Sequence, residues 1–68
     1  MKNRFAERLK EQRLAKGLSV EGLAKLIGVS GASVSSWENR INDIKSEYLM
    51  RLAKLFGVTA DYLLGLEE

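Results

Sequence analysis

The sequence has neither cysteine nor histidine. Disulfide bonds are therefore excluded, and so is any metal site built from those two residue types. No apolar run approaches the roughly 18 residues of a membrane span, and no signal-type apolar block follows the first four residues. We therefore expect a soluble cytoplasmic protein that carries no metal or cofactor and does not enter a membrane.

The same absences argue against catalysis. The acidic residues are scattered along the sequence rather than paired. Neither a nucleophile with its base nor an acid-base dyad can be assembled from them. We therefore expect no enzyme activity and no small-molecule substrate.

What is present indicates a single small domain over residues 1–68. Hydrophobic residues make up 46% of the chain, and they recur at helical spacing. The net charge is only +2, yet residues 1–16 hold six basic side chains against two acidic ones. This basic front is either a footprint for a phosphate backbone or an ordinary solvated helix face.

The stretch 19–40 predicts two short helices joined by a tight corner. Ser19 is a typical N-cap residue, and the apolar stripe that follows it ends at Gly28, which suits a left-handed C-terminal position. Ser30 then caps a second helix. The corner between the two helices is thus only about three residues long.

The second of these helices is expected to expose short polar side chains. At 100° per residue, Val34 and Trp37 share one side with Glu38 and Ile41, while Ala32, Ser36 and Asn39 point to the opposite side. A solvated helix normally carries strong helix formers there. A thin helix of this kind fits the major groove of B-DNA, although a plain connecting helix would show the same pattern.

Three more helices are expected, and no strand. One spans about 4–16, with Phe5, Leu9 and Leu14 inward; one begins at a Ser46 cap and ends at Gly57; a short one spans about 60–64 behind a Thr59 cap. Residues 23–30 recur as 52–59 with six of eight positions identical, which marks two similar helix corners. Between the third and fourth helices, Ile41 and Ile44 are expected to anchor a loop to the core.

Charged and apolar residues that lack an obvious place give two further predictions. Arg13 lies beside the inward stripe of its helix and needs an acidic partner, for which Glu38 is the best candidate. The C-terminal side chains of Tyr62, Leu63 and Leu66 either fold back on the core or form a dimer interface. Leu26 points away from the buried face of its helix.

Several motifs together resemble the Cro/C1-type helix-turn-helix domain of phage repressors and bacterial regulators. The resemblance covers almost the whole chain and is carried by Gly17-Leu18-Ser19, Leu23-Ala24, Gly28-Val29-Ser30, Val34-Ser35, Trp37-Glu38-Asn39, Leu52-Ala53, Gly57-Val58 and Tyr62-Leu63-Leu64. It implies an all-α, five-helix lambda-repressor-like DNA-binding domain. In that family the third helix enters the major groove, and a symmetric dimer reads two half-sites.

Carried over by position, the resemblance implies two sets of DNA contacts and one internal contact. The base-facing residues would be Gly31, Ala32, Ser33 and Ser36. The phosphate-contacting residues would be Ser19, Ser30, Ser35, Asn39 and Arg40. The Arg13–Glu38 pair matches an internal ion pair of the family.

The chain also departs from the family pattern. Val20 and Gly22 replace a common Gln and the Glu of the capping box, Arg40 replaces a common Gly, and Asp43 adds negative charge. No long Gln, Arg or Lys is available on the third helix for bidentate contacts with bases. We expect a sequence-specific transcriptional regulator, a repressor or its DNA-binding domain, that binds double-stranded DNA as a homodimer. The alternative is a helix-turn-helix-shaped protein-interaction module.

Overall fold

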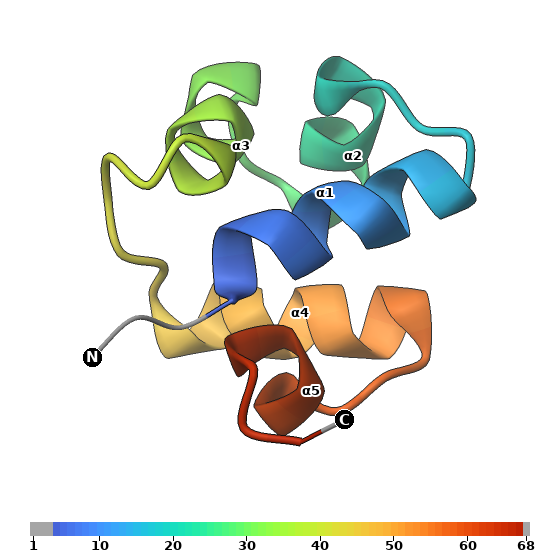
Figure 1. Cartoon of the computed structure of the whole chain (residues 1–68). Coiled ribbons are helices and arrows are strands. Elements are labelled where there is room, and N and C mark those ends of the chain that lie inside the picture. Colours follow the sequence, from blue (N-terminus) through green and yellow to red (C-terminus); the bar gives the residue numbers. More distant parts are fainter. Residues whose placement is uncertain (1–3, 68) are drawn as a thin grey trace.

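The computed structural model describes residues 4–67, and over this range it forms five helices and no strand (Figure 1). The helices are α1 (Phe5–Ala15), α2 (Val20–Ile27), α3 (Gly31–Glu38), α4 (Ser46–Phe56) and α5 (Ala60–Leu64). In Figure 1, α1 runs between the α2–α3 pair and the α4–α5 pair. The predicted all-α, five-helix fold is confirmed.

Helix starts follow the predicted caps in three cases. The hydroxyls of Ser19, Ser30 and Thr59 accept hydrogen bonds from the amides of Gly22, Ser33 and Tyr62. Each bond satisfies an amide that has no partner within its helix. The prediction for Ser46 is wrong: Lys45 precedes α4 without a side-chain cap, and Ser46 is the first helical residue.

The two similar stretches, 23–30 and 52–59, end their helices in the same way. Gly28 and Gly57 both adopt the left-handed conformation, with φ of 78° and 69°. The amides of Val29 and Val58 then donate to the carbonyls of Ala24 and Ala53. One local solution is thus used at two corners, each followed by a hydroxyl cap.

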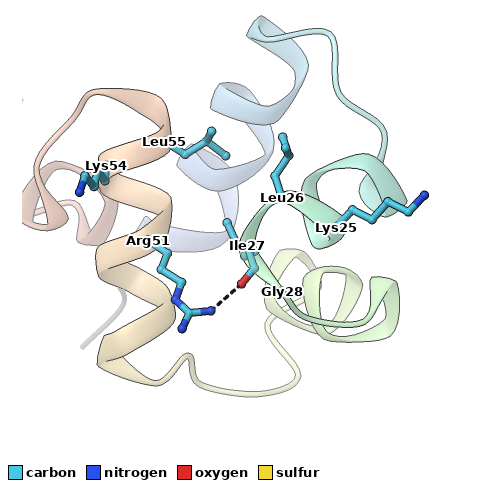
Figure 2. A pocket seen from close by; sticks show the side chains of 7 residues that line it. All are labelled: Lys25, Leu26, Ile27, Gly28, Arg51, Lys54 and Leu55. Carbon is cyan, nitrogen blue, oxygen red and sulfur yellow. Dashed lines mark hydrogen bonds between the residues drawn. The ribbon is translucent and has the colours of Figure 1, made fainter.

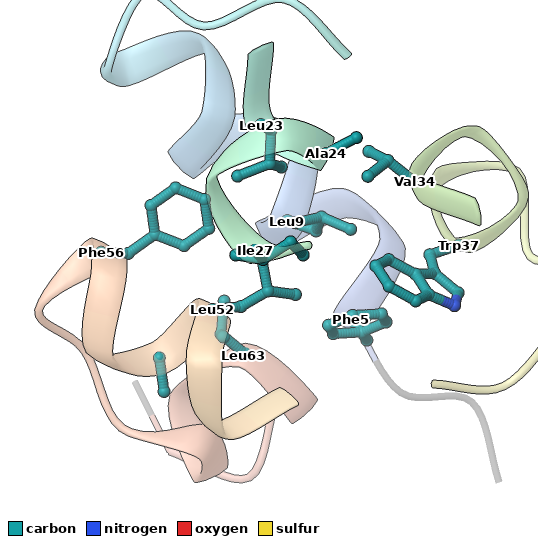
Figure 3. Packing of buried hydrophobic residues seen from close by; sticks show 11 residues of the cluster. Phe5, Leu9, Leu23, Ala24, Ile27, Val34, Trp37, Leu52, Phe56 and Leu63 are labelled. Carbon is teal, nitrogen blue, oxygen red and sulfur yellow. The ribbon is translucent and has the colours of Figure 1, made fainter. Parts of the chain in front are cut away.

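The core lies where all five helices meet, and Figure 3 shows it from close by. Its fully buried side chains come from every helix: Leu9, Leu23, Val34, Leu52 and Leu63. Val34 lies beside Ala24 of α2, and Trp37 lies beside Phe5 of α1. These contacts fix the inner face of α3, and they leave its opposite face to solvent.

Two apolar residues predicted to point inward do not. Leu14 is 58% exposed, because it lies about 140° around the helix from Leu9 at 100° per residue. Ile41 is 69% exposed, because the chain leaves the helix before it, with Arg40 at a φ of 60°. Ile44 is half-buried against the core as predicted, so it alone anchors the loop.

Candidate nucleic-acid interface

The corner between α2 and α3 determines which side of α3 faces outward. Gly28 turns the chain in the left-handed conformation, and Ser30 restarts the helix with its cap. Val34 and Trp37 are then buried against α2 and α1, whereas Ala32 and Ser35 are exposed and Ser33 and Ser36 are partly exposed. The accessible face of α3 therefore carries only a methyl group and hydroxyls.

Gly31 does not belong to this accessible face, and its predicted base-facing position is wrong. The residue is buried at the start of α3. A side chain there would overlap the carboxylate of Glu21, which reaches over from α2. A negative charge beside the start of α3 is favourable because the helix dipole is positive there.

A buried ion pair holds α3 to α1. Arg13 Nε lies 2.7 Å from Glu38 Oε2, Arg13 Nη2 lies 3.1 Å from Glu38 Oε1, and Arg13 Nη1 donates to the carbonyl of Leu18 at 2.9 Å. The side chains of Arg13 and Glu38 are only 10% and 8% exposed. The hydrogen bond to Glu38 raises the pKa of Arg13, against the lowering effect of burial. The pair expected from the sequence is thus present, next to the buried Trp37.

The residues predicted to contact phosphates lie at the two ends of α3 and at the start of α2. Ser19 and Ser30 are exposed caps whose hydroxyls already accept helix amides. Asn39 Nδ2 donates to the Ser35 carbonyl at 2.8 Å. Arg40 Nη2 contacts Glu7 Oε1 at 2.9 Å. Asn39 and Arg40 are therefore engaged within the molecule.

The basic front of residues 1–16 is not one continuous patch over the described part of it. Arg13 is buried with Glu38, and Arg8 donates to the carbonyls of Tyr62 and Glu67, both at 2.6 Å, with its guanidinium 4.2 Å from the Tyr62 ring centroid. These arginines tie helices together. Lys2 lies outside the described residues.

The residues predicted as a dimer interface separate into two groups. Leu63 is fully buried in the core, so its assignment to an interface is wrong. Leu63 belongs to the same buried cluster as Leu52 of α4, and Figure 3 shows both among the core side chains. Leu66 is 60% exposed, and Tyr62 is partly exposed beneath Arg8. Only the last two remain available to a partner.

A structural contact that the sequence analysis missed lies between α2 and α4. Arg51 Nη1 donates to the carbonyl of Ile27 at 2.9 Å, and Figure 2 shows this bond between α4 and the end of α2. The bond satisfies a carbonyl that the end of α2 leaves without a helical partner. Arg51 directly precedes the buried Leu52, and that basic residue next to a core position was the only sequence signal for it.

The described residues contain no group of acidic side chains suited to a metal ion. None of the helices between residues 4 and 67 combines the length and hydropathy needed to cross a bilayer. All buried side-chain nitrogen and oxygen atoms of the described residues have hydrogen-bond partners. In this part of the chain, side-chain polar atoms without a hydrogen-bond partner therefore lie at the surface.

Comparison with known proteins places this arrangement in a family. Residues 9–63 match the helix-turn-helix family model, and the chain belongs to this family of Cro/C1-type domains. Its structure is similar to the P22 c2 repressor, solved in complex with a synthetic operator, with a TM-score of 0.86, 30% identity and coverage of 93% of this chain and 96% of that one. It is also similar to a transcriptional regulator from Listeria innocua, with a TM-score of 0.90, 28% identity and coverage of 100% and 64%.

The curated relatives are longer than this chain. The uncharacterized HTH-type transcriptional regulator YobD of Bacillus subtilis is 34% identical over 64 residues, which are 94% of this chain and 57% of that protein. The repressor protein C2 of Salmonella phage P22 is 33% identical over 60 residues, which are 88% of this chain and 28% of that protein. The chain thus spans about half, or less, of the length of these relatives.

Proposed function

We propose that this chain is the DNA-binding unit of a sequence-specific transcriptional regulator, with repression as its mode of action. It acts in the cytoplasm, by binding and without catalysis. The observation that carries the proposal is the outward face of α3, where Ala32, Ser33, Ser35 and Ser36 leave a thin, uncharged helical surface. Among its relatives, the P22 c2 repressor is known in complex with an operator.

The proposed mode of binding places α3 in the major groove. The width of that groove admits one helix, and short side chains allow the helix axis to approach the base edges closely. Ser33 and Ser36 donate or accept hydrogen bonds there, and Ala32 contacts the methyl group of thymine. The free energy by which each such contact favours the correct base over a wrong one is then at or below the ~1–3 kcal/mol of a good bidentate pair.

Phosphate contacts position the helix in this proposal. The exposed caps Ser19 and Ser30 lie at the starts of α2 and α3, and Ser35, Asn39 and Arg40 flank the outer face of α3. Such contacts set the register of the protein on the duplex but carry no sequence information. A homodimer formed through Leu66 and Tyr62 would present two copies of α3 to two half-sites.

The experiment is a titration of duplex DNA with the chain at several salt concentrations. A DNA-binding domain shows log K falling linearly with log salt, by about 0.9 for each phosphate neutralised. Selection from random duplexes should also enrich one half-site sequence, and binding to it should persist in the presence of competitor DNA. If the half-site occurs twice at a fixed spacing, the bound protein is a symmetric dimer.

The second candidate function is a protein-interaction module with the same fold. One observation favours it: α3 offers no long side chain to bases. A salt-independent, weak association with DNA and no enriched sequence would refute the proposed function and support this module. Enrichment of a discrete site would refute the module.

A further inference from the structure

Positive charge is scarce around α3. Between Lys25 and Lys45 the sequence has a single basic residue, Arg40, against two acidic ones, Glu38 and Asp43. Glu38 is neutralised by Arg13, and the carboxylate of Glu21 lies over the start of the helix. Arg40 is therefore the cation that lies directly at the end of α3, and the next one along the chain is Lys45, beyond the loop, which lines a pocket with Ser33 and Trp37.

A tight turn holds Arg40 in place at the end of α3. The amide of Ile41 donates to the carbonyl of Ser36 at 2.9 Å, and the amide of Arg40 donates to the carbonyl of Trp37 at 3.3 Å. These two bonds are those of a Schellman motif, in which Arg40 takes the left-handed position that glycine usually occupies. The φ of 60° at Arg40 agrees with this assignment.

From this turn the guanidinium reaches α1 rather than solvent. Arg40 Nη2 lies 2.9 Å from Glu7 Oε1, across 33 residues of sequence. Both side chains are exposed, 51% for Arg40 and 61% for Glu7, so the pair is open to water and ions. An exposed ion pair of this kind is weak, and an incoming anion can replace one partner.

We propose that Glu7 restrains DNA binding by competing with backbone phosphates for Arg40. Binding then requires Arg40 to exchange the Glu7 carboxylate for a phosphate oxygen, and the carboxylate that it leaves adds repulsion toward the duplex. Because phosphates carry no sequence information, the restraint lowers affinity for every duplex alike. This inference rests on the proposed function, and it assigns to Glu7 a regulatory position outside the helix-turn-helix unit.

The test compares duplex affinity of Glu7→Gln with that of Glu11→Gln. Both changes remove one negative charge from α1, one helical turn apart, but only Glu7 contacts Arg40. We expect Glu7→Gln to bind specific and non-specific duplexes about two- to five-fold more tightly than the wild type, on the scale of an exposed ion pair. Glu11→Gln should change affinity by clearly less.

The same measurements in an Arg40→Gln background isolate the pair. Arg40→Gln alone should weaken binding and reduce the slope of log K against log salt by about 0.9, the loss of one phosphate contact. Adding Glu7→Gln to it should give no more gain than Glu11→Gln gives. Without DNA, the melting shifts of Glu7→Gln and Arg40→Gln should fail to add in the double variant, since both remove one contact.

The outcomes separate the two proposals. A wild-type chain that binds no duplex overturns the proposed function and this inference with it. A wild-type chain that binds while Glu7→Gln and Glu11→Gln behave alike overturns this inference alone. A gain from Glu7→Gln that persists in full in the Arg40→Gln background also overturns it, because the carboxylate would then act without Arg40.

Discussion

Arg40 is the one residue other than glycine with a positive φ in the described part of the chain. A left-handed conformation costs a residue with a Cβ roughly 1–2 kcal/mol, whereas glycine adopts it freely. Arg40→Gly should therefore be more stable than Arg40→Ala by about 1 kcal/mol, once the greater freedom of glycine in the unfolded chain is subtracted. Both variants lose the Glu7 contact, so their difference in free energy of unfolding, measured with denaturant, isolates the backbone. Equal stabilities would contradict a strained turn.

The Arg13–Glu38 pair gives the second prediction at this scale. Glu38→Ala leaves the guanidinium of Arg13 buried without its partner, which should cost ~3–5 kcal/mol. That is a large part of the ~3–10 kcal/mol expected in total for a domain of this size. Glu38→Gln keeps one acceptor and should lose less, so denaturant curves of both variants give a graded series.

Glu47→Ala is the control for this pair. Glu47 lies 3.9 Å from Arg51 with both side chains exposed, and its removal should cost less than about 1 kcal/mol. A similar cost for Glu38→Ala and Glu47→Ala would show that the buried pair adds nothing. The pKa of Arg13 is raised by its hydrogen bond to Glu38, so the contribution of its charge to stability is fully present at neutral pH and is lost as pH rises through that raised pKa.

The Arg13–Glu38 pair could be predicted from the sequence, whereas the Glu7–Arg40 pair could not, and the difference has a physical reason. Arg13 and Glu38 both lie on inward faces of their own helices, and a buried charge requires a partner. Glu7 and Arg40 are exposed, and nothing local demands that they meet. Their contact depends on how α1 crosses the end of α3, which helical periodicity does not contain.

At the scale of the element, α3 carries the proposed recognition of DNA. Ser36→Glu places a carboxylate on its outer face, where it would meet the negative potential of the groove. We expect loss of specific binding with the fold retained, because Ser36 is partly exposed and does not belong to the hydrophobic core. Duplex titration gives the affinity, and circular dichroism with thermal melting reports the fold.

Leu26→Glu is the matched control for this variant. It adds the same charge at an exposed position on α2, on the side of α4 and away from α3 (Figure 2). Its effect on DNA affinity should be limited to the general change in net charge. If Ser36→Glu retains operator affinity equal to that of Leu26→Glu, α3 does not enter the groove.

Helices and their limits were largely predictable, because glycine and hydroxyl residues mark them locally. Ser19, Ser30 and Thr59 cap as expected, and Gly28 and Gly57 end their helices. The failures at Ser46 and Ile41 share one cause. Each lies beside a loop whose path depends on tertiary contacts. The cap preference of serine therefore did not place Ser46, and continuing the helical periodicity of α3 past its end did not place Ile41.

The outer face of α3 was predictable for the same reason, and its first residue was not. Val34 and Trp37 define the buried side by periodicity, so the outward position of Ala32 followed. Gly31 has no side chain to orient. Its burial results from the carboxylate of Glu21 on the neighbouring helix, which only the packing of α2 on α3 brings there.

At the scale of the molecule, two C-terminal leucines lie in different environments, Leu63 in the core and Leu66 at the surface. Leu63 completes the core, so a domain of 68 residues uses its last helix to bury apolar area that four helices leave open. Leu66 follows the left-handed Gly65 and returns to solvent. Apolar composition alone did not separate these two leucines, because the direction of the chain after α5 decides which one is covered.

The proposed dimer can be tested at Leu66. Leu66→Glu should weaken self-association, because a charged side chain would have to be desolvated at the interface, while stability of the monomer changes little at an exposed position. Sedimentation equilibrium over a range of concentrations gives the association constant. Binding to a duplex with two half-sites about 34 Å apart should lose its advantage over a single half-site.

Leu14→Glu supplies the control for the dimer, since Leu14 is equally exposed, at 58% against 60%, but lies on α1. It should leave both self-association and the preference for paired half-sites intact. If Leu14→Glu and Leu66→Glu weaken association equally, the effect is one of added charge and the interface lies elsewhere. A wild-type chain that stays monomeric both free and on paired half-sites would refute dimerisation through Leu66 and Tyr62, and each α3 would then read its half-site alone.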